Sequence, residues 1–87
     1  MLFALMAKND AVIDPLVKAQ FADNHIKVGP GQWILSSDGN PTSKEVWDRL
    51  VGEATPTGII VAVSGYYGRA DTSVWEWVAS KRNAAQS

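Results

Sequence analysis

The segment that most constrains the fold lies between Gly58 and Gly68 and reads GIIVAVSGYYG. It begins as an uninterrupted run of apolar, mostly β-branched residues and ends in a turn rich in glycine and tyrosine. Such a run predicts a β-strand with apolar side chains on both faces of its sheet. A strand of this kind needs a cover on each face, so the chain must supply both covers or share one with another molecule.

The spacing of apolar residues predicts four strands and three helices. Continuous or alternating apolar stretches predict strands over residues 2–8, 25–28, 32–37 and 58–64. Apolar residues at helical spacing predict helices over 15–23 and 43–53 and a last helix that begins near residue 72. The strand 25–28 alternates polar and apolar residues, which is typical of a half-exposed edge strand.

Polar side chains predict where the helices begin. Asp14 is the expected N-cap of the first helix, with Pro15 at its first position and residues 9–13 as a loop before it. Thr42 and Glu45 have the spacing of a capping box, in which each side chain bonds the backbone N–H of the other residue. The second helix then presents one apolar face, formed by Val46, Trp47, Leu50 and Val51.

The last helix has several candidate start signals. Asp71, Thr72 and Ser73 are possible caps, and Ser73 has capping-box spacing to Glu76. Its apolar stripe consists of Val74, Trp77 and Val78. Trp75 and Trp77 cannot point the same way on a helix, because they are two residues apart. We therefore expect Trp75 to be at least partly exposed if Trp77 is buried.

The order of the elements predicts the fold. Strand, helix, strand, strand, helix and strand, followed by a terminal helix, is the arrangement of a ferredoxin-like α/β sandwich, βαββαβ. We predict one domain over residues 1–87, with a four-stranded antiparallel sheet and two helices on one face. The first and third strands should be central, and the second and fourth should lie at the edges. The strand 58–64 is too apolar for a bare edge, so the last helix or a second subunit should cover or extend it.

The second face of the sheet predicts self-association. The first, third and fourth strands carry apolar residues on the face opposite the two packing helices, which can shield only one side. A chain of 87 residues also builds only a modest core. Because a large exposed apolar patch usually marks an interface, we expect a homodimer.

Composition excludes several classes of site. Eight basic and nine acidic residues give a net charge of −1, without the basic excess that phosphate contacts usually require. Cysteine is absent and His25 is the only histidine, which excludes a structural zinc site. The apolar stretch 1–7 is too short to span a bilayer. We expect a cytoplasmic protein without a membrane partner.

Several segments together resemble a known family. They are the Pro15-Leu16 helix opening, Trp33-Ile34-Leu35 in the third strand, Thr42 to Leu50 as the second helix, and the stretch 60–65 ahead of Trp77. With these segments the chain resembles the small SinR-family proteins, relatives of the small CRISPR adaptation nuclease and of the GhoS antitoxin. The resemblance implies a ferredoxin-like dimer that contacts RNA or a protein partner.

The resemblance also implies a candidate catalytic residue. The nuclease relatives carry an aspartate at the end of the first strand, paired across a dimer to hold a divalent metal. Asp10 is the nearest match here, although it lies two or three residues later and Lys8 is close by. Asp10 is therefore the candidate catalytic and Mg²⁺-binding residue of a metal-dependent endoribonuclease. Outside that hypothesis, no cofactor is expected.

Aromatic residues give a second candidate site. Tyr66 and Tyr67 lie in a glycine-flanked loop close to Arg69, and exposed tyrosine with arginine is typical of binding hot spots. Such residues also stack on single-stranded nucleic acid. With Trp75 they form our candidate partner-binding residues. The leading hypothesis is a non-enzymatic, homodimeric, antitoxin-like or inhibitor-like module that binds protein or RNA. The alternatives are the endoribonuclease and a structural accessory subunit.

Overall fold

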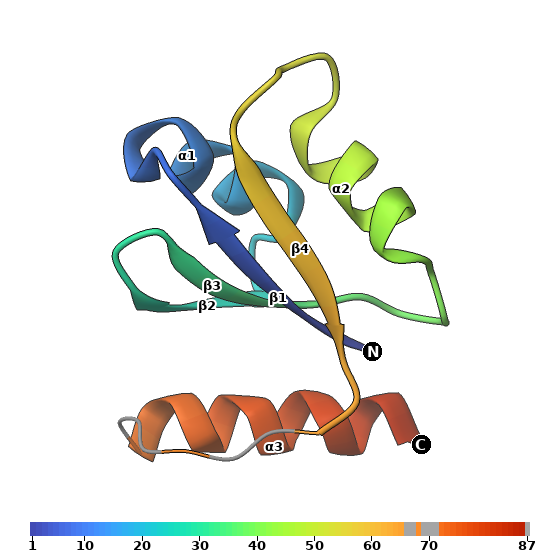
Figure 1. Cartoon of the computed structure of the whole chain (residues 1–87). Coiled ribbons are helices and arrows are strands. Elements are labelled where there is room, and N and C mark those ends of the chain that lie inside the picture. The colour runs from blue at the N-terminus through green and yellow to red at the C-terminus, as the bar shows by residue number, and fades with distance from the viewer. Residues whose placement is uncertain (66–67, 69–71, 87) are drawn as a thin grey trace.

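A four-stranded antiparallel sheet lies at the centre of the structure, a computed structural model that describes residues 1–65, 68 and 72–86 (Figure 1). The strand order is β2-β3-β1-β4. The strands are β1 (Leu2–Ala7), β2 (His25–Gly29), β3 (Gln32–Ser36) and β4 (Gly58–Val63). The helices are α1 (Asp10–Gln20), α2 (Ser43–Val51) and α3 (Thr72–Gln86).

This topology confirms the predicted ferredoxin-like βαββαβ arrangement with an added C-terminal helix. β1 and β3 are central and β2 and β4 lie at the edges, as the apolar patterns indicated. α1 and α2 cover one face of the sheet, which we call the first face, and α3 lies on the opposite, second face (Figure 1). No helix within the described ranges has the length and apolar composition that a membrane span requires.

The main core lies between the first face and the helices α1 and α2. Phe3 and Leu5 of β1 point into it beside Trp33 and Leu35 of β3, and each of these side chains is at most 1% exposed. The two helices contribute Ile13, Val17, Val46, Leu50 and Val51. Trp47 is only half-buried and packs against the edge of this cluster, while Trp33 is a full core residue.

α1 begins five residues earlier than predicted. Its N-cap is Asn9, and Pro15 lies inside the helix rather than at its first position, so the predicted cap at Asp14 and the loop over 9–13 are wrong. Pro15 costs one backbone hydrogen bond, because it has no N–H to donate one turn back. Ile13 and Val17, one turn apart and fully buried, offset that cost by packing on the same face of the helix.

α2 begins as predicted. The Glu45 N–H donates to the Thr42 hydroxyl, and the Thr42 N–H donates to the Glu45 carboxylate, each at 3.1 Å. The capping box is therefore complete, and it satisfies backbone donors that the first turn of a helix leaves unpaired.

α3 covers one part of the second face, which corrects the expectation that the helices shield only one side of the sheet. Val74 and Val78 are buried there with Leu2, and Trp77 packs against this second cluster. Its other members are Ile26, Ile34 and Val63. The helix begins at Thr72, so Ser73 lies within it and the capping box from Ser73 to Glu76 is wrong. The position before the helix, residue 71, lies outside the described residues.

Gly31, in the turn between β2 and β3, has a φ of +69°, and a Cβ there would lie 2.5 Å from the Ala7 carbonyl oxygen. Gly39 has a similar φ of +74° but faces open space, which makes it a matched control. We expect Gly39→Ala to cost about 1–2 kcal/mol of unfolding free energy. Gly31→Ala should cost more, roughly 3 kcal/mol, because strain and a backbone clash add. Urea unfolding measures both; equal losses would contradict the close approach.

Candidate functional site

The part of the second face that α3 leaves uncovered carries exposed large apolar side chains of β1 and β4. Met6 of β1 is 46% exposed, and Ile59 and Val61 of β4 are 62% and 41% exposed. Met6 lies opposite Ile59 in the β1–β4 ladder, and Val61 lies two residues further along β4. We call Met6, Ile59 and Val61 the open patch. A contiguous apolar surface of this kind is typical of an interaction site.

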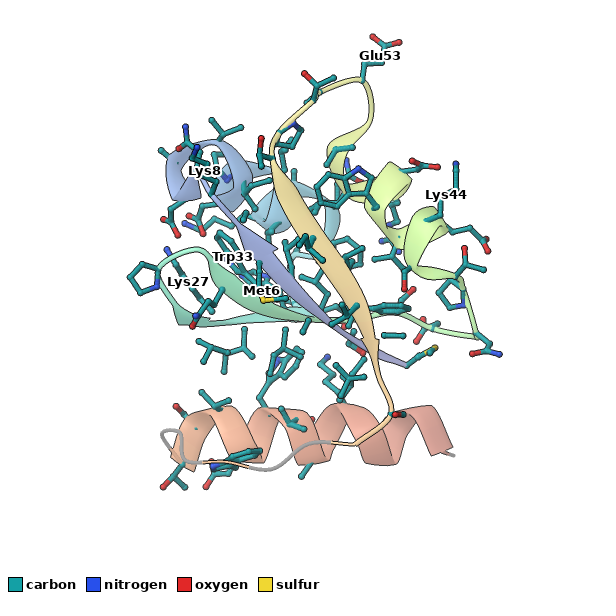
Figure 2. All side chains as sticks on the ribbon, in the orientation of Figure 1. Met6, Lys8, Lys27, Trp33, Lys44 and Glu53 are labelled. Atoms are coloured by element: carbon teal, nitrogen blue, oxygen red, sulfur yellow. The ribbon has the colours of Figure 1, made fainter. Side chains whose placement is uncertain are left out.

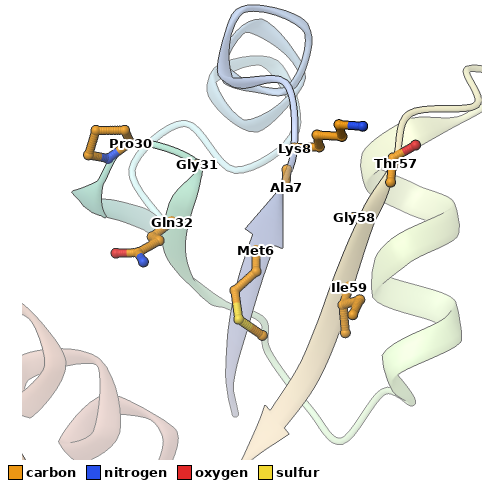
Figure 3. Close-up of a pocket in the computed structure, with 9 residues that line it drawn as sticks. All are labelled: Met6, Ala7, Lys8, Pro30, Gly31, Gln32, Thr57, Gly58 and Ile59. Carbon is orange, nitrogen blue, oxygen red and sulfur yellow. The ribbon is translucent and has the colours of Figure 1, made fainter.

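A shallow pocket adjoins the open patch. It has a volume of about 420 Å³ and lies where β1 ends, β4 begins and the β2–β3 turn approaches them (Figure 3). Its lining residues are Met6, Ala7, Lys8, Pro30, Gly31, Gln32, Thr57, Gly58 and Ile59. The Ala7 N–H donates to the Gly31 carbonyl at 2.8 Å, and the Lys8 N–H donates to the Thr57 carbonyl at 3.1 Å. These backbone groups are therefore already hydrogen-bonded to each other, so the pocket offers a bound group mainly apolar contact.

Asp10 has a structural role at the edge of this region. It lies in the first turn of α1, where one carboxylate oxygen accepts from the Gly31 N–H at 2.8 Å and the other from Lys27 Nζ at 2.7 Å. The hydrogen bond from Lys27, followed by that from Gly31, lowers the pKa of Asp10 below its ordinary value. Asp10 therefore fastens the β2–β3 turn to the start of α1.

This arrangement does not fit a divalent metal at Asp10. Both carboxylate oxygens are engaged, and the Lys27 ammonium occupies the position next to one of them. Within the described part of the chain, no three histidine, aspartate or glutamate side chains lie close enough together to hold a metal ion. Hard cations take six or more oxygen ligands, so one occupied carboxylate is a poor starting point.

A small charged cluster continues from Asp10 along α1. Lys18 Nζ pairs with the Asp14 carboxylate at 2.8 Å, and this contact is the main cause that lowers the pKa of Asp14. The buried Trp33 N–H makes no full hydrogen bond, but it lies near enough to Asp14 to favour the ionised form weakly. Lys27 Nζ lies 5.4 Å from the centre of the Trp33 ring, beside it on the hairpin (Figure 2). The Lys18–Asp14 pair thus lies within α1 and the Lys27–Trp33 contact within the hairpin, so Asp10 remains the side chain that bonds α1 to β2 and its turn.

The other predicted site residues divide into two groups. Tyr66, Tyr67 and Arg69 lie outside the described residues, so the structure does not bear on their proposed role. Trp75 is half-buried and engaged in a contact, and Trp77 is also half-buried. His25 Nδ1 lies 2.6 Å from the Phe21 carbonyl, which explains this half-buried side chain as a local anchor at the end of α1.

Sequence reasoning did not single out Met6, Ile59 or Val61. The sequence did indicate that the first and fourth strands carry apolar residues on both faces, and these three residues are among them. The sequence could not show which of them α3 would cover, because that depends on where the helix lies across the sheet.

No protein-family model, curated protein or solved structure matches the chain.

Asp10→Asn removes the charge but keeps the shape of the side chain. Because the folded-state pKa lies below the ordinary value of 3.8, ionised Asp10 stabilises the fold above that pH. This contribution disappears as the pH falls through the folded-state pKa. We expect a modest decrease in melting temperature at neutral pH that vanishes in strongly acidic solution. Thermal melts across pH, with the exposed Glu53→Gln as control, measure it; a decrease that is the same at every pH would contradict the ion pair.

Proposed function

We propose that this protein is a non-enzymatic interaction module that works as a homodimer and binds a protein partner through the open patch. The observation that carries the proposal is the exposure of Ile59, at 62%, on the part of the second face that α3 leaves uncovered. Burial of such a side chain against a partner gains roughly 1.5–3 kcal/mol. Met6 and Val61 widen the surface around it.

The shape of the surface supports binding to a protein. The open patch adjoins a concave region of about 420 Å³, so a projecting apolar side chain of a partner has a place to insert. Lys8 and Gln32 lie at the margin of this pocket and can supply polar contacts. An apolar centre with a polar rim is the usual anatomy of a protein–protein interface.

RNA fits this surface less well. The net charge of −1 offers no general attraction to phosphate, and the open patch itself is aliphatic. Stacking on single-stranded bases requires aromatic side chains, which Met6, Ile59 and Val61 do not supply. A protein partner is therefore the better choice.

The resemblance to SinR-family proteins agrees with this proposal. An antitoxin-like or inhibitor-like module that acts by binding another macromolecule needs a docking surface and no reaction centre. The endoribonuclease alternative depends on Asp10, and the contacts of Asp10 with Lys27 and Gly31 do not favour it. Membership of the family is part of the proposal.

A matched set of baits tests the proposal. Immobilised wild-type protein, Ile59→Lys and Val12→Lys are exposed to extract from the native host, and captured proteins are identified after ribonuclease treatment. Val12 lies on α1, is 44% exposed, and controls for the added charge. We expect wild type and Val12→Lys to retain the same partner. Ile59→Lys should lose it by roughly tenfold, since buried apolar anchors dominate interfaces.

Two outcomes would count against the proposal. If Ile59→Lys retained the same proteins as wild type, the open patch would not be the binding surface. If ribonuclease removed the captured material, the partner would be RNA rather than protein.

A further inference from the structure

The two edges of the sheet differ in how they are protected against pairing. The β2 edge carries Lys27, has a register irregularity between Lys27 and Gly29, and is followed by Pro30. Charged side chains, bulges and proline are the devices by which edge strands avoid pairing with other chains. The β4 edge has none of them, because residues 54–65 include no charged residue and the only proline, Pro56, lies before the strand.

The alternation of hydrogen bonds shows which backbone groups of β4 face outward. The Lys8 N–H donates to the Thr57 carbonyl, and the two residues are opposite each other in the continued β1–β4 register. In an antiparallel ladder, hydrogen-bonded pairs recur at every second residue. Ile59, Val61 and Val63 therefore bond to β1. The N–H and C=O groups of the intervening residues Gly58, Ile60 and Ala62 point away from the sheet.

The β1–β3 ladder agrees with this assignment. The Ala7 N–H donates to the Gly31 carbonyl, so the odd-numbered residues of β1 bond to β3 and the even-numbered ones remain for β4. Among the residues that the structure describes, no backbone partner is found for the outward groups of Gly58, Ile60 and Ala62. The edge therefore presents a regular row of free donors and acceptors.

From this geometry we infer that β4 pairs antiparallel with β4 of a second copy of this chain, about a two-fold axis at Ile60. Ile60 then lies opposite its own counterpart, and Gly58 lies opposite Ala62. Each of these pairs exchanges two hydrogen bonds, because all their backbone groups point outward. The two sheets become one continuous eight-stranded sheet.

The position of the axis follows from the side chains. An axis at Ile60 sets Ile59 directly beside Val61 of the second copy, and the reverse, in the close non-hydrogen-bonded spacing. These are the two exposed large apolar side chains of β4. An axis at Val61 would instead set Ile59 beside Val63, which already packs against the α3 cluster. No like charges meet in the pair, since residues 54–65 are uncharged.

The pairing unites two copies of the proposed binding surface. A two-fold axis of this kind is perpendicular to the sheet, so the second faces of both copies lie on the same side. The two open patches then form one apolar strip across the seam. This inference deepens the proposed function, since it specifies the homodimer that the proposal requires.

Ala62→Pro tests the pairing at the backbone. Ala62 is exposed and its N–H points outward, so proline removes a bond to the second copy and none to β1. Proline is tolerated at such edge positions. Ala62→Val keeps the N–H and is the matched control. Light scattering during size exclusion should give wild type and Ala62→Val twice the 9.4 kDa chain mass, and Ala62→Pro a single chain mass.

Disulfide trapping tests the register without relying on the proline variant. The chain has no cysteine, so single substitutions report cleanly. The Cα atoms of a non-hydrogen-bonded pair lie about 4.5 Å apart, within reach of a disulfide. A mixture of Ile59→Cys and Val61→Cys should form a covalent dimer on mild oxidation. Neither variant alone should do so, and Val12→Cys on α1 controls for random collision.

The outcomes separate this inference from the proposed function. A wild-type dimer that persists in Ala62→Pro, or trapping of Val61→Cys alone in preference to the mixture, overturns the pairing but leaves a homodimer. A wild-type monomer overturns the pairing and the homodimer together. A wild-type monomer therefore also removes the homodimer from the proposed function, whereas failure of the β4 pairing alone does not. Capture of a partner through the open patch is measured by the separate bait experiment.

Discussion

The structure depends on covering both faces of β1, which is hydrogen-bonded to a strand on each side. Its side chains alternate between the two faces, with Phe3 and Leu5 on the first and Leu2 and Met6 on the second. Strands spaced by about 4.8 Å make a four-stranded sheet roughly as wide as two helices, each about 10 Å across. α1 and α2 therefore cover the first face. α3 alone covers only part of the second, which leaves the open patch beyond its reach.

The hydrogen bonds of Asp10 to Lys27 and Gly31 link the two faces of the sheet. The Asp10 carboxylate ties the start of α1, on the first face, to the β2–β3 turn, whose residues Pro30, Gly31 and Gln32 form one side of the pocket. The positive end of the α1 dipole and the Lys27 ammonium both favour a negative charge at this point. The family resemblance suggested Asp10 as a metal ligand. Its contacts instead give it a structural role, because they position the turn that lines the pocket beside the open patch.

The sequence predicted the fold well because its signals were long and redundant. Apolar residues on both faces identified β1 and β3 as central strands, and the Thr42–Glu45 capping box located the start of α2. The predicted start of α1 was wrong because Asp14 and Pro15 are a strong local signal for a helix start, whereas tertiary packing decides the actual start. Ile13 and Val17 become buried only when α1 docks on the sheet, and no local pattern contains that gain in free energy.

The candidate site was less predictable for a related reason. The stripe of Val74, Trp77 and Val78 predicted that α3 would pack, but not which rows of the sheet it would cover. Met6 and Ile59 became candidates only once the register placed them side by side at the uncovered end. Tyr66, Tyr67 and Arg69, which composition favoured, remain predictions outside the described residues.

The open patch and the unpaired β4 edge both follow from the position of β4, which lies at the edge of the sheet and largely beyond the cover of α3. An uncharged apolar strand at the edge of a sheet is a liability for a lone chain, because it invites irregular association. Ordered pairing through β4 removes that liability by using the outward backbone groups, and the patches of both copies then meet at the seam. A partner bound across the seam contacts both copies and therefore favours the paired form by mass action. Self-association and partner binding would in this way reinforce each other. The backbone groups of Gly58, Ile60 and Ala62 serve the pairing, while the side chains of Ile59 and Val61 serve both the seam and the partner surface.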